Sequence, residues 1–393
     1  MNILNKISPF FIDNNQDLLK NKRIILRVDY NVPLKDNKTV LDSTRIMNSL
    51  KTINFLLKRN NDIILLTHLG RPKTEEDKQK YTTKTIYNFI KENNLFDCSN
   101  FEFVEDIDTQ IEYKGKNIYL VENVRFFNGE TKNNLELARK YANLGDVFVN
   151  DAFGSLHRVH SSVAGISNYL PTYFGLLVKE EIINLSKLLT PKRPYLIILG
   201  GAKVSDKLNL INNLLNKCDK MIITGAACLT LYKSLNFNIG KSFFEELDVS
   251  NLLNNSSVIL PTEFIATDDI SNPNSKIKKN IKEIGGNDII VDALINEEIK
   301  NVILSSNTIF WNGPAGIFEK GYNQGSFEII KTLAESNAFK VIGGGDTVNF
   351  INTVPEYKSK LDFISTGGGA TLEFLEKETL DALEYILNVK SNI

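Results

Sequence analysis

The sequence predicts an α/β protein made of two lobes, each a mostly parallel sheet flanked by helices. Short apolar runs recur along the chain, and each ends at a glycine or a polar cluster. Stretches with helical spacing lie between these runs, and one amphipathic stretch bounded by prolines divides them into two series. Unbroken β-branched runs suit strands that are buried on both faces, and strand alternating with helix implies parallel sheets covered by helices.

The predicted strands fall into a first and a second series. In the first half they cover 23–32, 62–69, 118–124 and 146–153, and in the second half 195–201, 220–227, 257–266, 308–315, 339–345 and 363–369. Residues 43–60 and 205–217 have the apolar spacing of helices that cover such sheets. Both lobes are therefore expected to be Rossmann-like in organisation.

The junction between the lobes is visible in the sequence. Between Pro171 and Pro194 lies GLLVKEEIINLSKLLT, whose apolar residues follow helical spacing and whose ends are set by proline. We expect a hinge helix there. The predicted domains are an N-terminal domain over 1–175, a linker helix over 176–190 and a C-terminal domain over 191–375.

The composition excludes several classes of protein. The 393 residues are 42% hydrophobic and 24% charged, with a net charge of -1, which argues against a nucleic-acid binder that relies on a global positive field. Cys98, Cys218 and Cys228 are odd in number and widely spaced, as in a reducing compartment. The N-terminus has no signal-peptide pattern, and no apolar run has the length of a membrane span. We expect a soluble cytoplasmic protein with no membrane partner.

All three histidines of the chain stand close to arginine. His68 lies in THLGRP, and His157 and His160 lie in NDAFGSLHRVHSS around Arg158. Three chemical interpretations compete with a plain surface turn: half of a metal site, a serine nucleophile beside a histidine (Ser155, Ser161 or Ser162), and a cationic site for an anion. A metal site needs further ligands, a hydrolase would want a G-x-S-x-G elbow that is missing, and arginine suits carboxylate and phosphate.

Basic and polar residues follow the predicted strands of the first half. Arg45, Arg71, Arg125 and Arg158 each fall at or just after a strand end. Since ligands of open parallel sheets bind outside the carboxyl ends of the strands, these arginines and His68 could surround a small, multiply charged anion. Asp29 and Asn31 could bind its hydroxyl group.

The second half offers glycines at its strand ends, in LGGAK, IGGGDT and STGGGAT. Glycines at a strand-to-helix turn let the backbone approach a phosphate. At the start of a helix, Lys203 and Lys207 would share one face and resemble a phosphate clamp, and Asp346 could hold Mg²⁺ carried by a nucleotide. Glu319 could accept a hydrogen bond from a ribose hydroxyl, although the pattern of either acid taken alone favours a surface charge or a helix cap. Neither a P-loop nor a G-x-G-x-x-G turn is present.

Eight motifs, in order between residues 27 and 376, resemble those of the phosphoglycerate kinase family. They are RVDYNVPL, LTHLGRP, VENVRF, NDAFGSLHRVHSS, ILGGAKVSDKL, WNGPAGIFE, GGGDT and STGGGATLE. The resemblance implies reversible phosphoryl transfer between ATP and 3-phosphoglycerate, giving ADP and 1,3-bisphosphoglycerate, with Mg²⁺, in a hinge-bending monomer. It also implies that a C-terminal segment, 376–393, returns to the N-terminal domain.

The resemblance assigns roles to matching positions. The residues expected to bind 3-phosphoglycerate are Asp29, Asn31, Arg45, His68, Leu69, Gly70, Arg71, Arg125 and Arg158. Those expected to bind the nucleotide are Gly201, Ala202, Lys207, Gly225, Asn312, Glu319, Gly344, Gly345, Asp346 and Thr347, with Asp346 holding Mg²⁺ through the nucleotide. The expected catalytic groups are Arg45, Lys203, Lys207, Gly345 and Gly368. His157 and His160 are either supporting residues near the hinge or purely structural.

Some positions depart from the family pattern. The family usually has IIGGGMAF where this chain has IITGAACL, so Thr224 and Ala226 replace glycines near the expected adenosine site. The stretch 285–292 lacks an expected Gly-Pro, and LEKE at 375–378 replaces LEGK. Two alternatives therefore stand beside the kinase interpretation: a nicotinamide dehydrogenase, and a catalytically silent paralogue that binds nucleotide as a scaffold.

Overall fold

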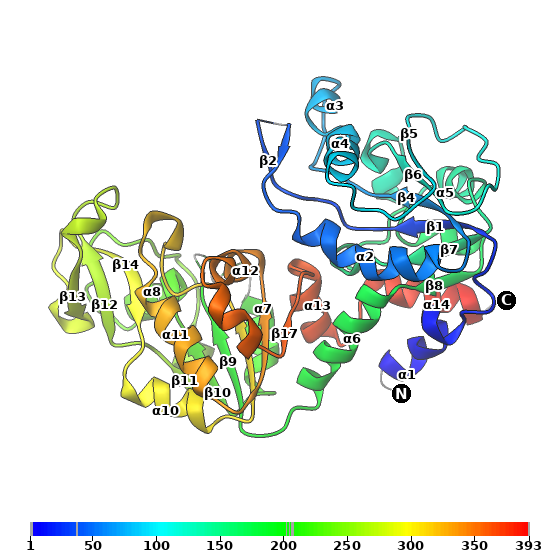
Figure 1. The fold of residues 1–393 in the computed structure, drawn as a ribbon. Helices are drawn as coiled ribbons and strands as arrows, with labels where there is room; N and C mark the ends of the chain where they lie inside the picture. Colours follow the sequence, from blue (N-terminus) through cyan, green and yellow to red (C-terminus); the bar gives the residue numbers. More distant parts are fainter. Residues whose placement is uncertain (1–2, 37, 202, 204, 206–207, 392–393) are drawn as a thin grey trace. The chain divides into compact units, whose positions relative to one another are not determined.

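The computed structural model describes residues 3–36, 38–201, 203, 205 and 208–391, and the chain forms two compact units. Unit 1 comprises Met1–Ile183 together with Lys377–Ile393, and unit 2 comprises Asn184–Glu376 (Figure 1). Helix α6 (Leu176–Leu189) forms within the predicted linker region, and the unit boundary falls inside it. In the part of the chain that is described, no helix combines the length and the apolarity that crossing a membrane requires.

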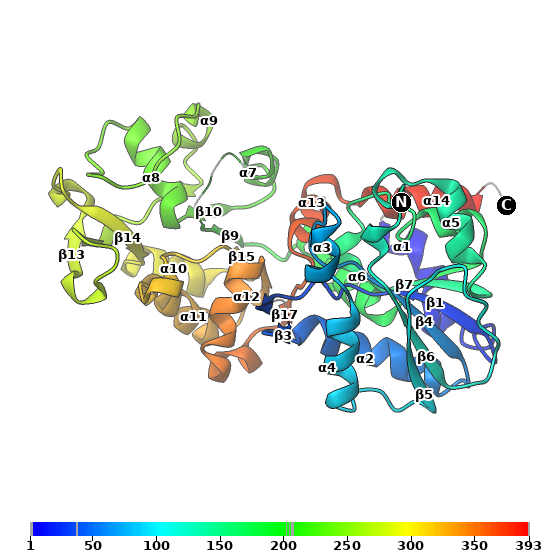
Figure 2. The ribbon, with the colours of Figure 1, turned by 90° about the horizontal axis from the view of Figure 1, so that it is seen from above.

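Unit 1 is built on a six-stranded parallel sheet in the order β5-β6-β4-β1-β7-β8. Its strands are β1 (Arg23–Arg27), β4 (Asp62–Leu66), β5 (Asn100–Val104), β6 (Asn117–Val121), β7 (Val147–Asn150) and β8 (Thr172–Phe174). Helices α2 (Thr44–Leu57) and α4 (Lys84–Glu92) cover one face, and α5 (Leu135–Ala142) lies on the other (Figure 2). The smaller elements are α1 (Ile3–Ile7), α3 (Glu76–Lys80), and the hairpin β2 (Leu34–Lys35) and β3 (Thr39–Val40).

Strand β1 shows why this sheet is buried on both sides. Ile24 and Leu26 pack in the core that contains Ile53 of α2, whereas Ile25 packs in the opposite core with Tyr141 of α5. Successive side chains of a strand point to opposite faces, so an unbroken apolar run is needed where helices cover both. The short 3₁₀ helices of unit 1 are η1 (Ser8–Phe10), η2 (Ile12–Asn14), η3 (Val124–Phe126), η4 (Glu130–Lys132), η5 (Phe153–Ser155) and η6 (Gly165–Asn168).

The last helix, α14 (Asp381–Ser391), belongs to unit 1. The backbone N–H of Ala382 donates to the carbonyl of Leu156 at 3.0 Å, and the amide of Asn168 donates to the Tyr385 hydroxyl at 3.0 Å. The ammonium of Lys390 lies 5.7 Å from the centre of the Phe10 ring. These contacts join α14 to both the start and the middle of the unit.

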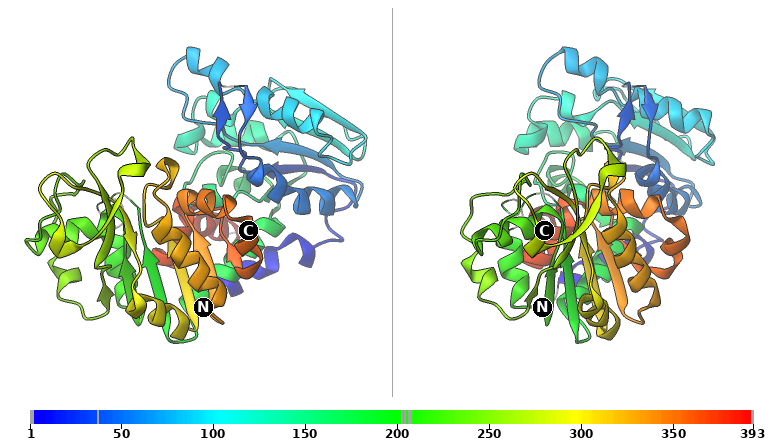
Figure 3. Two further views of the ribbon diagram at one scale, coloured as in Figure 1. Left: turned by 60° about the vertical axis from the view of Figure 1, so that its left-hand side comes forward. Right: turned by 90° about the vertical axis from the view of Figure 1, so that its left-hand side faces the viewer.

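Unit 2 contains a second six-stranded parallel sheet, in the order β11-β10-β9-β15-β16-β17 (Figure 3). Its strands are β9 (Tyr195–Leu199), β10 (Lys220–Ile223), β11 (Val258–Ile259), β15 (Thr308–Asn312), β16 (Phe339–Gly343) and β17 (Phe363–Ile364). Its helices are α7 (Leu208–Leu215), α8 (Gly225–Ser234), α9 (Ser250–Leu253), α10 (Glu297–Ser305), α11 (Gln324–Glu335), α12 (Gly345–Asn352) and α13 (Gly369–Lys377). Figure 2 shows α7 and α8 on one side of this sheet and α10 to α12 on the other.

One predicted strand is wrong. Residues 257–266 do not form a single strand but divide into β11 and β12 (Glu263–Thr267), with Pro261 between them. Proline has no N–H to give to a sheet, so the run breaks there. Strand β12 instead pairs antiparallel with β13 (Ile277–Asn280) and β14 (Ile289–Leu294) in a small separate sheet. Unit 2 also contains the short helices η8 (Pro273–Ser275), η9 (Ile281–Glu283), η10 (Phe318–Lys320) and η11 (Pro355–Lys360).

Candidate functional site

The polar residues of unit 1 gather where its parallel strands end. Asp29 and Asn31 follow β1, His68 and Arg71 follow β4, and Arg125 lies on η3 after β6. Strands β1, β4 and β6 are neighbours in the sheet, so their carboxyl ends share one edge. Arg45 adds to this edge from the first turn of α2, and Arg158 from the segment after η5.

The segment after β1 is fixed by its own polar side chains. The Arg45 guanidinium donates to a carboxylate oxygen of Asp29 at 2.9 Å, and the side-chain oxygen of Asn31 accepts from the Gly70 N–H at 2.9 Å. The Asp29 side chain is 10% exposed and that of Arg45 is 32% exposed. This ion pair is therefore partly shielded from water. The guanidinium N–H groups of Arg45 that do not bind Asp29 can still donate to an anion.

Arg125 is joined to the loop after β4. Its guanidinium donates to the carbonyl of Gly70, and its backbone N–H donates to the side chain of Asn123 at 3.1 Å. Asn123 also donates to the carbonyl of Leu69 at 2.7 Å. Hydrogen bonds thus hold the loop after β4, with the predicted residues 68–71, against Arg125. Asn123 connects the two segments, and the sequence analysis did not single it out.

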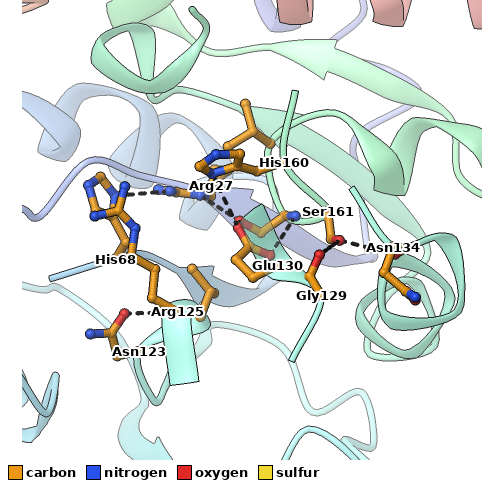
Figure 4. A network of polar contacts seen from close by, with 12 residues as sticks. Arg27, His68, Asn123, Arg125, Gly129, Glu130, Asn134, His160 and Ser161 are labelled. Carbon is orange, nitrogen blue, oxygen red and sulfur yellow. Dashed lines mark hydrogen bonds and ion pairs between the residues drawn. The ribbon is translucent and has the colours of Figure 1, made fainter. Parts of the chain in front are cut away.

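His68 has a partner that sequence reasoning missed. A guanidinium nitrogen of Arg27, the last residue of β1, lies 3.1 Å from Nδ1 of His68 (Figure 4). Arg27 is 1% exposed and His68 is 8% exposed. Since arginine can only donate, Nδ1 of His68 must accept, which places the ring proton on Nε2. The only sequence signal for Arg27 was its position inside an otherwise apolar strand.

The positive charges of the arginines at this sheet edge act on His68 and on one another. Burial lowers the pKa of His68 well below its usual value, and Arg27, Arg125, Arg45 and Arg158 lower it further. Burial, together with Arg158, Arg27 and Arg71, lowers the pKa of Arg125 to about 10. We call Arg27, Arg45, Arg71, Arg125 and Arg158 the arginine cluster. Because His68 is neutral and the arginines are positively charged, this edge of the sheet carries an excess of positive charge that favours the binding of an anion.

The histidine and serine alternatives receive no support from the described residues. No group of three or more His, Cys, Asp or Glu among them is arranged to hold a metal ion. The Ser161 hydroxyl donates to the carbonyl of Asn134 at 3.0 Å, and the Ser162 hydroxyl donates to Glu130 at 2.6 Å. Burial and three arginines lower the pKa of His160 to about 4. His160 is thus a neutral ring near neutral pH, and its 4.0 Å approach to Glu130 is no ion pair there.

Unit 2 contains a cavity of about 390 Å³ that is lined mainly by glycine. Its walls come from the turns after β9, β15, β16 and β17. We call it the glycine cavity. The residues that line it are Gly201, Lys203, Asn312, Gly313, Gly344, Gly345, Asp346, Thr347, Gly368, Gly369 and Leu372.

The glycine cavity depends on close backbone packing. Gly344 has φ of 90°, and a Cβ atom there would lie 2.7 Å from Nδ2 of Asn312. The buried hydroxyl of Thr347 accepts from the Gly313 N–H at 2.7 Å, which ties α12 to the turn after β15. A Cβ atom on Gly345 or Gly368 would meet no described residue within 4 Å. The open space above these two residues is room for a ligand.

Four predicted nucleotide residues either do not line the glycine cavity or fall outside the residues that the structure describes. Glu319 is exposed on η10, and Gly225 begins α8 with φ of 64°; neither lines the cavity. Ala202 and Lys207 lie outside the described residues. Thr224 is buried and Ala226 is half-buried, and neither lines the described cavity.

Comparison with known proteins shows to which family the chain belongs. The profile of the family described as phosphoglycerate kinase matches residues 14–378. The chain belongs to the phosphoglycerate kinase family. The phosphoglycerate kinase of Thermosipho africanus is 39% identical over 95% of this chain and 96% of its own length. That of Thermus thermophilus is 39% identical over 93% of this chain and 97% of its own.

Solved structures of phosphoglycerate kinases have the same fold. That of Coxiella burnetii has a TM-score of 0.81 at 33% identity and covers 94% of this chain and 97% of its own. That of Pyrococcus horikoshii also has a TM-score of 0.81, at 26% identity, over 98% of this chain and 99% of its own. The predicted two-lobed α/β fold is confirmed, and so is the predicted family. Its members are phosphotransferases with a carboxyl group as acceptor, so the dehydrogenase alternative is wrong.

Proposed function

We propose that the arginine cluster and His68 bind 3-phosphoglycerate and that the glycine cavity binds the phosphates of ATP or ADP. The observation that carries this proposal is the different chemistry of the two units. Unit 1 gathers five arginines at one sheet edge, whereas unit 2 offers glycine turns with a lysine and a carboxylate. Arginine matches carboxylate and phosphate oxygens in pairs, and glycine turns admit polyphosphate to the backbone.

In unit 1 the substrate's phosphate would meet Arg71, Arg125 and Arg158. Asp29 and Asn31 would bind the hydroxyl group, and Leu69 and Gly70 would shape the wall. His68, with its proton on Nε2, would donate to an oxygen of the substrate. Arg45 would reach the carboxylate where the transfer takes place.

In unit 2 the nucleotide phosphates would lie against Gly201, Lys203 and the turn Gly344–Thr347. Ala202, Lys207, Gly225 and Asn312 would complete their surroundings, and Glu319 would accept from the ribose. A Cβ atom on Gly345 or Gly368 would meet no atom of the described residues within 4 Å, so the amides of these two glycines would be accessible to phosphate oxygens.

The residues of the glycine cavity fit a nucleotide-bound Mg²⁺ ion. Asp346 is an exposed carboxylate in the first turn of α12 and lines the cavity. Mg²⁺ prefers oxygen ligands and takes most of them from phosphates and water when it travels with a nucleotide, so one protein carboxylate suffices. Asp346 would hold this ion, which neutralises charge on the nucleotide phosphates.

Because the acceptor is a carboxylate, the proposed reaction does not require a general base in the site. A carboxylate is already ionised at neutral pH, so the attack needs no general base. The protein must position the two substrates and compensate the charge of the transferring phosphoryl group. Arg45, Lys203 and Lys207 would supply positive charge, with hydrogen bonds from the amides of Gly345 and Gly368.

The two ligands must meet for transfer to occur. We therefore infer that the units close on one another about the linker at 176–190, in a cytoplasmic monomer working in glycolysis and gluconeogenesis. Closure would also exclude water, which would otherwise compete with the carboxylate for the phosphoryl group. The N-terminal domain (1–175) with the returning segment 376–393 would carry the phosphoglycerate, and the domain at 191–375 the nucleotide.

Equilibrium titration of the full chain with each substrate tests the assignment of the two sites. 3-Phosphoglycerate should bind without nucleotide, and Arg125→Ala should weaken it while leaving ATP·Mg²⁺ binding unchanged. Asp346→Ala should weaken the binding of ATP·Mg²⁺ and leave the binding of 3-phosphoglycerate unchanged. If both variants weakened the same ligand, or neither weakened any, the division of substrates between the units would be wrong.

A further inference from the structure

A buried polar network lies beneath the arginine cluster. Glu130, on η4, is 2% exposed, and Ser162 is fully buried. The Ser162 hydroxyl donates to one carboxylate oxygen of Glu130 at 2.6 Å, and the Ser162 N–H donates to the other at 3.1 Å. Figure 4 shows the Glu130 carboxylate on the side of Arg27 away from His68. None of these atoms is accessible to a substrate.

Ser162 connects this carboxylate to Arg27. Nε of Arg27 donates to the Ser162 hydroxyl oxygen at 3.1 Å. The hydroxyl has one proton, which goes to Glu130, so its lone pair is oriented toward the guanidinium. A second guanidinium nitrogen donates to the Val28 carbonyl, and the third approaches Nδ1 of His68. All three guanidinium nitrogens of Arg27 therefore have hydrogen-bond partners within the protein.

The charges explain why the network needs Glu130. A fully buried guanidinium has lost its water and requires a nearby negative charge. Glu130 and Asp29 both favour the charged form of Arg27. Asp29, however, already accepts from Arg45. Glu130 is the carboxylate that is joined to the buried side of Arg27, through the Ser162 hydroxyl.

The backbone around Glu130 is held in place as well. The Ser161 N–H donates to the Glu130 carbonyl at 2.9 Å, and the Ser161 hydroxyl donates to the carbonyls of Gly129 and Asn134 at 3.2 and 3.0 Å. Two stretches of chain, 129–134 and 160–162, are thus joined at several points. A carboxylate held in this way can fix the orientation of a neighbouring side chain.

We propose that Glu130 is a positioning residue, which acts through Ser162 to hold Arg27 so that Arg27 donates to Nδ1 of His68. His68 is then kept as the neutral ring with its proton on Nε2, ready to donate to an anionic oxygen. Neither Glu130 nor Ser162 touches the substrate. The expected effect on substrate affinity rests on the proposed binding of 3-phosphoglycerate by His68, whereas the effect on the His68 ring does not.

The imidazole nitrogens provide the first test. The chain has only three histidines, so ¹⁵N-resolved NMR of the full protein can follow each ring. In the wild type, His68 should show a bare Nδ1 and a protonated Nε2 near neutral pH. A proton on Nδ1 of His68 would overturn the proposal without any variant. His68→Gln identifies the resonance.

Two variants then break the network at different points. Ser162→Ala removes the bridging hydroxyl and leaves both charges, and Glu130→Gln keeps the shape but removes the negative charge. Both should shift the His68 ring toward a mixture of tautomers. Both should raise the KM for 3-phosphoglycerate by about tenfold, as for loss of a hydrogen bond to a charged group, with the KM for ATP within about twofold. Ser162→Thr, which keeps a hydroxyl, should restore the His68 signal.

Asp62→Asn is the matched control for a purely structural effect. Asp62 is a buried carboxylate that accepts from the backbone of Lys114 and Asn117 at 2.6 and 2.8 Å. It begins β4, so it lies at the opposite edge of the sheet, roughly 13 Å from the site by the rise of a strand. The control should lower the melting temperature without moving the His68 signal or changing either KM.

The outcomes separate this proposal from the proposed function. A folded Ser162→Ala protein with an unchanged His68 ring would overturn the positioning role, as would equal losses for both substrates that match those of Asp62→Asn. A shifted ring with an unchanged KM for 3-phosphoglycerate would support the positioning of His68 and contradict its assignment to that substrate.

Discussion

Gly344 and Asn312 are packed so closely that no side chain fits between them. Gly344 has φ of 90°, and a Cβ atom on it would lie 2.7 Å from the Asn312 amide nitrogen. The turn after β16 is therefore shaped around the last residue of β15. Both residues line the glycine cavity, and so does Gly345, where a Cβ atom would meet no atom of the described residues within 4 Å.

Gly344→Ala should damage the nucleotide site. The left-handed backbone and the contact with Asn312 together predict a loss of roughly 1–3 kcal/mol in the free energy of unfolding. Denaturant unfolding measures this loss of stability. The KM for ATP should rise, whereas the KM for 3-phosphoglycerate should not change. Gly345→Ala, one residue along, keeps the amide and should change stability by less than about 1 kcal/mol. Equal effects of the two substitutions would contradict the described packing.

Arg125→Lys should weaken binding of 3-phosphoglycerate although the positive charge remains. Lysine offers a point charge in place of the planar donors of arginine, and it cannot hold the Gly70 carbonyl and an anion with the same geometry. We expect the KM for 3-phosphoglycerate to rise by about tenfold or more, measured at saturating ATP. Arg139→Lys, on the exposed surface of α5, is the same chemical change and should have no effect.

Thr347→Val should destabilise unit 2 by removing the acceptor of the Gly313 N–H. Valine keeps the shape of threonine, but a buried N–H without a partner costs about 1–3 kcal/mol. Thermal unfolding of Thr347→Val and Thr347→Ser measures this loss, since serine retains the oxygen. A valine variant as stable as the serine variant would show that this hydrogen bond does not hold the turn.

Asp151 makes stability depend on pH. Burial raises the pKa of its carboxyl to about 7, although the N–H groups of Leu177 and Val178 donate to it. The folded state therefore keeps a proton that the unfolded state has released, and stability falls as pH rises toward and through 7. The side chain at this position does not titrate in the Asp151→Asn variant. The free energy of unfolding of the variant minus that of the wild type should therefore increase from pH 5 to pH 8. Urea unfolding at several pH values would show a constant difference if the carboxyl were not shifted.

The sequence predicted those site residues that stand at strand ends. Arg71, Arg125 and the GGGDT turn follow apolar runs, and parallel strands bring their ends to one edge, so their proximity could be inferred without coordinates. Strands β5 and β8 were missed because β5 alternates half-buried with exposed residues and β8 is only three residues long. Short or mixed strands give little periodic signal.

Arg27, Glu130 and Ser162 show what the pattern could not reveal. In the sequence, Arg27 is one polar residue in an apolar strand. Glu130 and Ser162 lie 32 positions apart, on the 3₁₀ helix η4 and in a turn. Their connection depends on tertiary packing, which decides which loop covers the end of β1. Likewise, the contact of Gly344 with Asn312 arises only because β16 pairs with β15 in a particular register.

Turnover is the most direct test of the account as a whole. The purified chain should convert ATP, Mg²⁺ and 3-phosphoglycerate at enzyme-like rates in an assay that couples 1,3-bisphosphoglycerate to NADH oxidation. Lys207→Ala and Arg45→Ala should abolish it by removing positive charge from the transferring group. A folded protein that binds 3-phosphoglycerate but shows no turnover would contradict the kinase assignment and leave a silent binding paralogue.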